Sequence, residues 1–350
     1  MTAVQDTSLD VLWYTRCPVP TATSIAIETG LLDRHFEPDG IAVRSLNASD
    51  SRATRESHFD HGTRGLFRHG GNTPPIWARS RGVDTAVIAL SWVDEYQAIL
   101  ALPESGIRTI KDLRGRRLGV PVRVNDRIDF FRAMSMRGYL TALDLGGIAR
   151  SDVEFVELPI TERYIGAEQG DRRGTLWSGA QRSRRQQAEM FALIRGDIDA
   201  FVTSGGMGAY LAAMLGAHEV LEFGSHPDSD VRISNQAPAT LTVDRWLLEH
   251  APQLAVRFLK QVMLGADWAV DHPAQARRIV GRETGVLEDW VERAYGARFH
   301  TRMALSLDDR SIRALVKQKD FLLENGFIAA DFDVAEWIRP EALAQAARER

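Results

Sequence analysis

Cys17 is the strongest candidate for covalent chemistry, because it is the only cysteine among the 350 residues. It follows an apolar run at 11–13 and precedes Pro18 and Pro20. Proline suits the first turn of a helix, so this order predicts a thiol near a helix N-terminus. The helix dipole there favours a thiolate, and Arg16 would add to the effect. A lone cysteine is more often a small buried hydrophobe, and composition alone favours that alternative.

A second group of reactive side chains lies at 58–75, which holds three histidines, two arginines and a Gly-Gly pair ahead of two prolines. Glycine recurs and apolar residues are sparse, so we expect a loop whose polar groups can reach a ligand. Arg68 beside Gly70 and Gly71 could hold an oxyanion together with bare backbone N–H groups. The alternative is a solvated, charged loop, and spacing alone does not decide between the two.

These side chains need elements to position them, and strand-like and helix-like segments alternate over most of the chain. The patterns predict strands at 9–14, 83–92, 153–158 and 200–203, and helices at 21–32, 186–195, 254–270 and 311–324. Such alternation is typical of an α/β protein with largely parallel sheets. The length suggests two domains, each large enough to bury its own core.

Three phrases of the sequence resemble the type II periplasmic solute-binding proteins. Residues 110–120 are similar to the segment that opens their second lobe, and Arg195-Gly196-Asp197-Ile198-Asp199-Ala200 to the segment that closes it. Residues 241–280 resemble their C-terminal helices. The resemblance implies two α/β lobes with an interlobe cleft, one lobe formed by 1–103 with 218–350 and the other by 104–217.

The two reactive segments together resemble the aromatic sulfinate desulfinases, the 2'-hydroxybiphenyl-2-sulfinate desulfinase-like family. Those enzymes carry a cysteine followed by Pro-Val-Pro, as in Cys17-Pro18-Val19-Pro20. They also carry His-Phe, an arginine ten residues after that histidine, Gly-Gly and Pro-Pro. The corresponding residues are His58-Phe59, Arg68, Gly70-Gly71 and Pro74-Pro75. The resemblance implies a cofactor-independent enzyme that cleaves a carbon–sulfur bond and releases sulfite.

The resemblance also implies a role for each matched residue. Cys17 would be the nucleophile or proton donor, and Arg68 would hold the sulfinate oxygens through two contacts. His58 would form a hydrogen bond near Cys17 and so affect the protonation and orientation of the thiol. The backbone N–H of Gly71 would complete the oxyanion cradle. The further substrate-binding residues implied are Gly70, Phe59, Thr15 and Trp177. Two routes stay open, one with attack of the thiolate on sulfur and one with protonation of the ring carbon by the thiol.

The sequence departs from the family pattern in three places. Arg16 replaces the small polar residue that usually precedes the cysteine, and Thr63 stands where the family has a glutamine. Residues 125–187, which should supply the far wall of the cleft, show little similarity. We therefore expect the reaction class to be shared but the substrate to differ from hydroxybiphenyl sulfinate.

Composition narrows the remaining possibilities. A formal net charge of −4 and a pI near 6.2 give no reason to expect nucleic-acid binding. His61 and His69 lack a third ligand for a metal, so we expect neither metal nor cofactor. The N-terminus lacks the basic and apolar regions of an export signal, and no apolar stretch is long enough to span a membrane. We expect a cytoplasmic monomer acting on a small-molecule sulfinate; the alternative is a non-catalytic solute-binding protein or sensor for a sulfonate-like or aromatic ligand.

Overall fold

The computed structural model describes residues 9–166 and 186–350, and its strands form two five-stranded sheets. The first sheet has the order β2-β1-β3-β10-β4 and the second the order β7-β6-β8-β5-β9. In the first sheet the strands are β1 (Val11–Arg16), β2 (Ala42–Ser45), β3 (Leu66–Gly70), β4 (Thr85–Ser91) and β10 (Ala239–Asp244). In the second they are β5 (Gln97–Ala101), β6 (Arg117–Arg123), β7 (Glu154–Ile160), β8 (Ala200–Ser204) and β9 (His218–Glu222).

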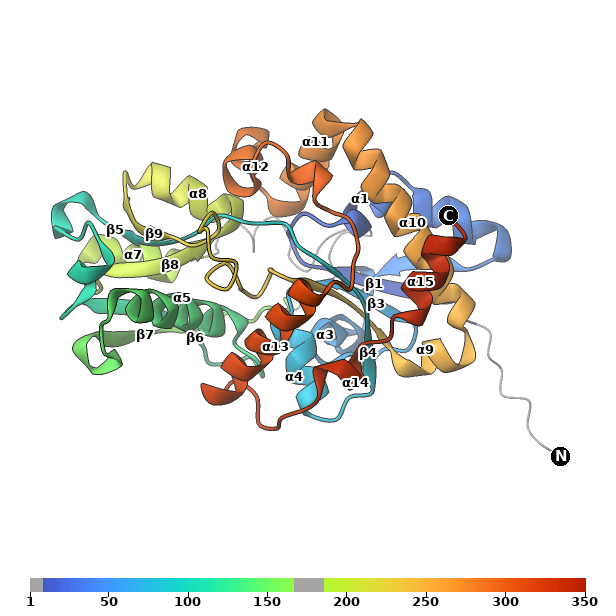
Figure 1. Cartoon of the computed structure of the whole chain (residues 1–350), viewed down its shortest axis with the longest axis horizontal. Helices are drawn as coiled ribbons and strands as arrows, with labels where there is room; N and C mark the ends of the chain where they lie inside the picture. Colours follow the sequence, from blue (N-terminus) through green and yellow to red (C-terminus); the bar gives the residue numbers. More distant parts are fainter. Residues whose placement is uncertain (1–8, 167–185) are drawn as a thin grey trace.

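Helices flank both sheets and give two α/β lobes side by side (Figure 1). The second lobe carries α5 (Phe130–Gly146), α7 (Gln187–Arg195) and α8 (Gly205–Met214). The N-terminal helices of the first lobe are α1 (Ala22–Glu28), α2 (Leu31–Phe36), α3 (Arg52–Asp60) and α4 (Thr73–Ser80). The C-terminal series comprises α9 (Arg245–His250), α10 (Pro252–Asp271), α11 (Pro273–Thr284), α12 (Glu288–Tyr295), α13 (Asp309–Glu324), α14 (Val334–Trp337) and α15 (Glu341–Arg348).

The chain crosses between the sheets twice, through the segment 92–96 from β4 to β5 and through 223–238 from β9 to β10. The sequence placed the lobe boundaries at 103/104 and 217/218. That division would assign β5 and β9 to the first lobe, whereas both strands pair within the second sheet. The difference arises because each crossover lies beside a strand that pairs antiparallel to its neighbours, a feature the sequence pattern does not reveal.

Both sheets are mixed, which corrects the expectation of largely parallel sheets. β1 pairs in parallel with β2 and β3, whereas β10 runs antiparallel to β3 and β4. In the second sheet β6 is parallel to β7 and β8, whereas β5 is antiparallel to β8 and β9. The antiparallel strands are the ones that adjoin the crossovers.

The segment 58–75 is not the loop that its composition suggests. It comprises the end of α3, the strand β3 and the start of α4, and all five residues of β3 are buried. β1 and β10 pair with the two edges of β3. Both of its faces are buried as well, so its polar and apolar residues do not alternate as they do in a half-exposed strand. In register, Thr15 faces Arg68 and Arg16 faces His69. The carboxyl ends of β1 and β3 therefore bring Cys17 and Gly71 to the same sheet edge, the usual place for a site in an α/β protein.

The prolines after Cys17 lie outside the helix that follows, although the sequence predicted them in its first turn. α1 starts at Ala22, and its N-cap Thr21 accepts a hydrogen bond from the Ser24 N–H. Pro18 and Pro20 therefore lie in the connection between β1 and α1 and not in the first helical turn. The predicted helix 21–32 is also interrupted, because Gly30 adopts a φ of 72° between α1 and α2.

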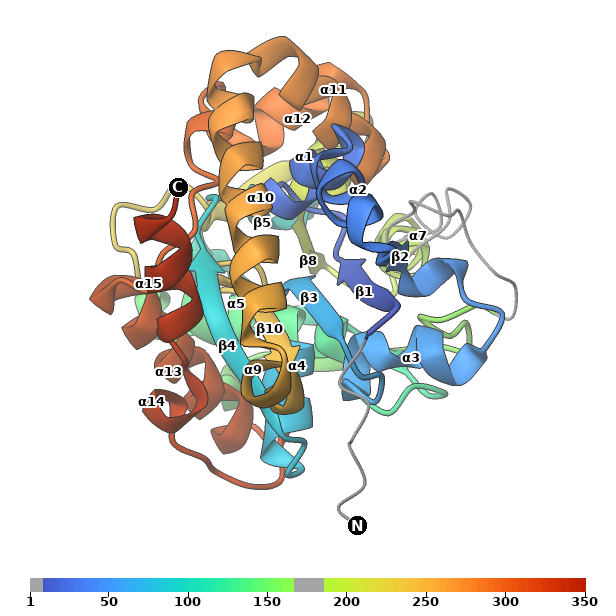
Figure 2. The same cartoon turned by 90° about the vertical axis from the view of Figure 1, so that its right-hand side faces the viewer.

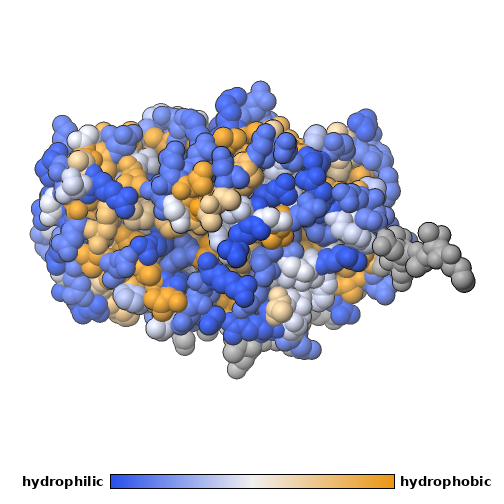
Figure 3. All heavy atoms as spheres, turned by 90° about the horizontal axis from the view of Figure 1, so that it is seen from below, coloured by the Kyte–Doolittle hydropathy of each residue, from blue (hydrophilic) through white to orange (hydrophobic). Residues whose placement is uncertain are grey.

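The core of the first lobe is closed by long C-terminal helices. α10 lies across the first sheet (Figure 2) and contacts α1. Phe258 of α10 stacks on Phe67 of β3 with ring centroids 3.8 Å apart. α10 and α13 confirm the predicted amphipathic helices at 254–270 and 311–324. On the face shown in Figure 3, hydrophobic side chains are interspersed with hydrophilic ones. Among the described helices, none has both the length and the apolar character needed to cross a membrane.

Candidate active site

Three polar groups surround the Cys17 sulfur. The Gly71 N–H donates to Sγ over 3.4 Å, Arg68 Nη2 lies 3.9 Å from it, and His58 Nε2 lies 3.8 Å away. Only 6% of Cys17 is exposed. The sequence predicted that Cys17, His58, Arg68 and Gly71 act together, and the fold brings them together from β1, α3, β3 and the turn before α4.

The two glycines permit this close approach. Gly70 has a φ of 153°, and a Cβ atom there would lie 2.5 Å from Cys17 Sγ. A Cβ atom on Gly71 would lie 2.4 Å from the side-chain nitrogen of Asn235, which belongs to the second crossover. Asn235 in turn accepts from the Thr73 N–H at the start of α4. Gly70 thus leaves room for the thiol, whereas Gly71 leaves room for the residue that secures its own turn.

Arg68 is completely buried, and two of its three nitrogens hold backbone carbonyls. Its Nε donates to the His58 carbonyl over 2.8 Å and its Nη1 to the Gly71 carbonyl over 2.7 Å. Only Nη2 faces the thiol, so this geometry offers an oxyanion one guanidinium nitrogen, whereas two contacts were predicted. Burial lowers the pKa of Arg68, and the neighbouring Cys17 opposes that shift.

The contacts of His58 determine which ring nitrogen carries its proton. Arg68 Nη2 lies 3.3 Å from His58 Nε2, and a guanidinium can only donate, so Nε2 must be the acceptor. The proton is therefore on Nδ1, which donates to Thr15 Oγ1 over 2.8 Å. Burial, followed by the positive charges of Arg68 and His61, holds the pKa of His58 well below its ordinary value of 6.5. His58 is consequently a neutral imidazole whose Nε2 accepts from Arg68 and lies 3.8 Å from the thiol sulfur.

Thr15 and Phe59 both contact the imidazole ring of His58. Thr15 was predicted to bind substrate, but its hydroxyl accepts the His58 proton and so orients the imidazole. Phe59 packs on the ring of His58 at 4.9 Å and reaches Phe130 and Tyr164 at 6.3 and 5.8 Å. It therefore begins an aromatic cluster that extends from α3 into the second lobe.

Trp177, Thr63 and the segment 125–187 were the remaining positions expected to affect substrate binding. Trp177 lies outside the described residues. Thr63 is half-buried, and its hydroxyl lies 2.7 Å from the Ser57 hydroxyl within the segment that joins α3 to β3. Of the range 125–187, which was expected to supply the far wall, α5 does contribute residues that face Cys17.

Arg16 does not lie beside the thiol. Successive side chains of a strand point to opposite faces, so Arg16 points away from Cys17. Its guanidinium forms ion pairs with Glu283, which is itself buried, and with Glu28 at 3.0 Å. The Ser24 hydroxyl also donates to Glu283. The expected contribution of Arg16 to the thiolate is therefore neutralised by carboxylates on the opposite face of β1.

His61 and His69 have structural partners. His69 Nδ1 lies 2.7 Å from the Thr23 hydroxyl and Nε2 lies 3.0 Å from the Ser91 hydroxyl. His61 Nε2 lies 2.8 Å from the Thr242 hydroxyl. Burial, assisted by the charge of Arg68, lowers the pKa of each histidine to about 3. Within 9–166 and 186–350, no group of three histidine, cysteine, aspartate or glutamate side chains is placed to hold a metal ion.

A small cavity over Cys17 is lined from both lobes. Its apolar wall comes from α5, whereas its polar wall comes from the crossovers, the start of α8 and the end of α12. The lining residues are Cys17, Pro18, Val19, Glu95, Phe130, Phe131, Met134, Ser204, Gly205, Gln236 and Tyr295. The sequence analysis missed Glu95 and Gln236, because each lies in an irregular crossover and meets Cys17 only after the lobes pack together.

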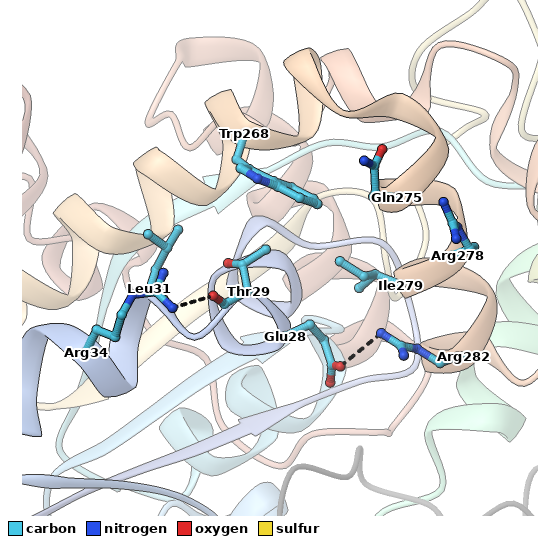
Figure 4. A pocket seen from close by; sticks show the side chains of 9 residues that line it. All are labelled: Glu28, Thr29, Leu31, Arg34, Trp268, Gln275, Arg278, Ile279 and Arg282. Atoms are coloured by element: carbon cyan, nitrogen blue, oxygen red, sulfur yellow. Dashed lines mark hydrogen bonds and ion pairs between the residues drawn. The ribbon is translucent and has the colours of Figure 1, made fainter.

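A separate groove of about 450 Å³ lies away from the thiol, between the α1–α2 connection and helices α10 and α11 (Figure 4). Glu28 projects into it and pairs with Arg282 at 3.2 Å, while its other oxygen holds the buried Arg16. The groove contains none of the residues around Cys17. The candidate active site is therefore the smaller interlobe cavity, which Cys17 lines.

Comparison with known proteins identifies full-length relatives. No family model matches the chain. It is 24% identical to 2'-hydroxybiphenyl-2-sulfinate desulfinase from Rhodococcus erythropolis and to the same enzyme from Rhodococcus qingshengii, in each case over 95% of this chain and 93% of the relative.

The fold is also that of solved relatives. The desulfurization enzyme DszB superposes with a TM-score of 0.79 at 26% identity, over 97% of this chain and all of that one. A cysteine-to-serine mutant of DszB in complex with biphenyl-2-sulfinic acid gives a TM-score of 0.76 at 25% identity, over 97% and 99% of the two chains. A putative periplasmic sulfonate-binding protein from Methylobacillus flagellatus gives 0.71 at 14% identity, over 97% and 94%. These likenesses confirm the predicted two-lobed solute-binding fold.

Proposed function

We propose that this chain, a homologue of 2'-hydroxybiphenyl-2-sulfinate desulfinase, is a hydrolase that cleaves the carbon–sulfur bond of an aromatic sulfinate. The overall reaction would convert the aryl sulfinate and water into the arene and hydrogen sulfite. Cys17 would act at the sulfinate, with Arg68 and the Gly71 N–H holding its oxygens and His58 next to the thiol. The reaction balances with water alone and requires no redox partner.

The observation that carries the proposal is a buried positive charge beside the thiol. No carboxylate among the described residues forms an ion pair with Arg68, although the guanidinium is completely buried. Burying a charge is costly unless a partner of opposite sign accompanies it. A sulfinate bound at Arg68 Nη2 and the Gly71 N–H would supply that negative charge next to Cys17.

In the first route, the Cys17 thiolate attacks sulfur. A sulfur–sulfur bond forms, the carbon–sulfur bond breaks, and the aryl group leaves as the arene with the proton that the thiol gave up. Water then releases hydrogen sulfite and restores the thiol. The Gly71 N–H and Arg68 Nη2, both directed at Sγ, support this route because both donors stabilise a thiolate.

In the second route, the Cys17 thiol protonates the ring carbon that bears sulfur. The carbon–sulfur bond breaks, its electron pair stays with the ring as the arene forms, and sulfur dioxide leaves and is hydrated to hydrogen sulfite with release of a proton. The thiolate left behind recovers a proton from water. The same two donors would stabilise that thiolate, so the geometry is compatible with either route.

The neutral His58 would serve both routes by fixing Arg68 Nη2 beside the thiol, because its Nε2 accepts from that nitrogen. Its lowered pKa makes it a weak base, so it does not hold a proton permanently. The aromatic side chains Phe59, Phe130 and Phe131 supply the apolar surface that an aryl group would contact.

A second candidate is a non-catalytic binding protein or sensor, because the fold is shared with sulfonate-binding proteins. The test is sulfite release from a panel of aryl sulfinates by wild type and by Cys17→Ser, with sulfinate binding measured in parallel by calorimetry. The enzyme proposal predicts sulfite from wild type, none from Cys17→Ser, and binding by both. If both proteins bind a sulfinate equally and neither releases sulfite, the chain is a binding protein.

A further inference from the structure

We propose that the groove between the α1–α2 connection and helices α10 and α11 is a second ligand site, which binds a small aromatic anion. The groove shares no lining residue with the cavity over Cys17. The proposal therefore does not rest on the proposed function, and the two can be tested separately.

The groove is large enough for a small molecule. Its volume of about 450 Å³ falls within the range of about 300–1,000 Å³ that is usual for small-molecule pockets. α2 contributes Leu31 and Arg34, α10 contributes Trp268, and α11 contributes Arg278 among others (Figure 4). Arg34 and Arg278 are exposed, so a ligand can enter the groove directly from solvent.

Trp268 gives the groove an aromatic wall. Its indole projects into the groove toward Ile279 of α11 (Figure 4). One face of the indole is stacked on the His272 imidazole, with ring centroids 4.4 Å apart and an interplanar angle of 9°. The side chain is only half-buried, so part of the indole stays available to a ligand. An aryl ring placed there would bury apolar surface against Trp268 and Ile279.

The charges in the groove do not balance. Three arginines line it, and Glu28 is the one carboxylate among the described lining residues. Glu28 pairs with Arg282 over 3.2 Å, and its other oxygen pairs with the buried Arg16 over 3.0 Å. Neither Arg34 nor Arg278 forms an ion pair within the described ranges 9–166 and 186–350. The groove thus carries an excess of positive charge, which favours an anionic ligand.

The arginines of the groove can hold a carboxylate directly. Arg34 uses only Nη1 within the described protein, where it donates to the Thr29 carbonyl over 3.0 Å. Arg278 and Arg282 are four residues apart on α11, so they lie on the same face of the helix. A guanidinium can form two parallel hydrogen bonds with a carboxylate. Arginines and an indole in one groove therefore favour an arene that carries a carboxylate.

The experiment measures by calorimetry the affinity for 2-naphthoate, for the neutral 2-naphthalenemethanol and for acetate, which keeps the carboxylate without the ring. Wild type is compared with Arg278→Gln, Trp268→Leu, Arg68→Met and Arg313→Gln, the last of which changes an exposed arginine of α13 outside the groove. Wild type should bind 2-naphthoate with a Kd below about 1 mM, and about tenfold more tightly than either other compound. Arg278→Gln and Trp268→Leu should each weaken binding by about tenfold, whereas Arg68→Met and Arg313→Gln should not.

Three results would overturn the proposal. If the alcohol or acetate binds as tightly as 2-naphthoate, or if Arg278→Gln keeps the wild-type affinity, the groove is not a site for an aromatic anion. If Arg68→Met abolishes binding, the ligand occupies the site at Cys17 instead. Trp268 packs against the core, so if Trp268→Leu does not fold, as judged by thermal unfolding, the exposed Arg278→Gln decides. Sulfite release is not measured, so a failure of the proposed function would leave these results unchanged.

Discussion

Two buried arginines on adjacent strands have opposite electrostatic surroundings. Arg16 on β1 is 2% exposed and forms ion pairs with Glu283 and Glu28, whereas Arg68 on β3 is 0% exposed and has no carboxylate partner among the described residues. Burial disfavours the charge of Arg16, but Glu283 foremost among its neighbours raises the pKa above its ordinary value. For Arg68 burial prevails and the pKa is lowered.

We propose that the difference separates a structural charge from a functional one. Arg16 ties α1 and α11 to the back of β1, and its charge is balanced within the protein. Arg68 instead holds the His58 and Gly71 carbonyls and leaves one nitrogen facing the thiol. Burying an unpaired charge costs free energy, and an anionic ligand bound next to Cys17 would offset that cost.

The largest expected effect follows from removing the unbalanced charge. Arg68→Met should lower kcat/KM for sulfite release by about a thousandfold, because the oxyanion loses a charged donor and the thiolate loses a neighbouring cation. The change is measured by steady-state kinetics, with Arg64→Met, an exposed arginine of the same segment, as the control. A loss below about tenfold would show that Arg68 is not the functional arginine.

Removing the balanced charge should act on stability instead. Arg16→Met leaves Glu283 buried without its cation, and breaking a buried pair from one side costs about 3–5 kcal/mol. Urea unfolding should therefore show a larger loss of stability for Arg16→Met than for Arg68→Met. The double change Arg16→Met with Glu283→Gln should recover part of the loss, and the distinction fails if the order of the two single variants is reversed.

Part of this arrangement was predictable from the sequence. The strand that ends before Cys17, the β-strands at 85–91 and 200–204 and the long helices follow from apolar periodicity. The orientation of Arg16 was not predicted, because the expected strand ended at residue 14 and Arg16 was placed beside the thiol. β1 in fact extends to Arg16, and alternation along it turns that side chain away from Cys17. Its partner Glu283 lies 267 residues away, and no local pattern links the two.

The remainder depended on tertiary packing. β3 contains Arg68 and His69 at buried positions and so lacks the apolar alternation by which a half-exposed strand is recognised. The motif at 58–75 matched a family, but its composition predicted a loop. Glu95 and Gln236 lie in crossovers without periodicity, and they approach Cys17 only because two lobes close over the same cavity.

The charge of Arg68 should also affect stability against acid. After burial, Arg68 is the cause of the lowered pKa of His61 and His69, each about 3 in the folded protein. Below pH 6.5 both histidines bind protons in the unfolded chain but stay neutral in the folded chain until the pH approaches 3. Stability should then fall with decreasing pH by up to about 1.4 kcal/mol per unit for each histidine, from about pH 6.5 toward pH 3.

Histidine NMR titration and urea unfolding at several pH values check this prediction. The resonances of His61 and His69 should not titrate between pH 5 and about pH 8 in wild type. In Arg68→Met the apparent pKa of both should rise, since one of the two causes is removed. Ordinary titration near pH 6.5 in wild type would contradict the burial argument.

The smallest expected effect concerns Thr15, which holds His58 and not the substrate. Thr15→Val keeps the shape but leaves the Nδ1–H of His58 without an acceptor, and an unsatisfied buried donor costs about 1–3 kcal/mol. The imidazole can then exchange tautomers, so kcat should fall about tenfold with little change in KM. Thr15→Ser keeps the hydroxyl and should retain most of the activity.

Nitrogen NMR of His58 distinguishes this positioning role from a structural one, because the proton should reside on Nδ1 in wild type and Thr15→Ser but move partly to Nε2 in Thr15→Val. If Thr15→Val instead raises KM and leaves the tautomer unchanged, Thr15 contacts the substrate, as the family resemblance implied.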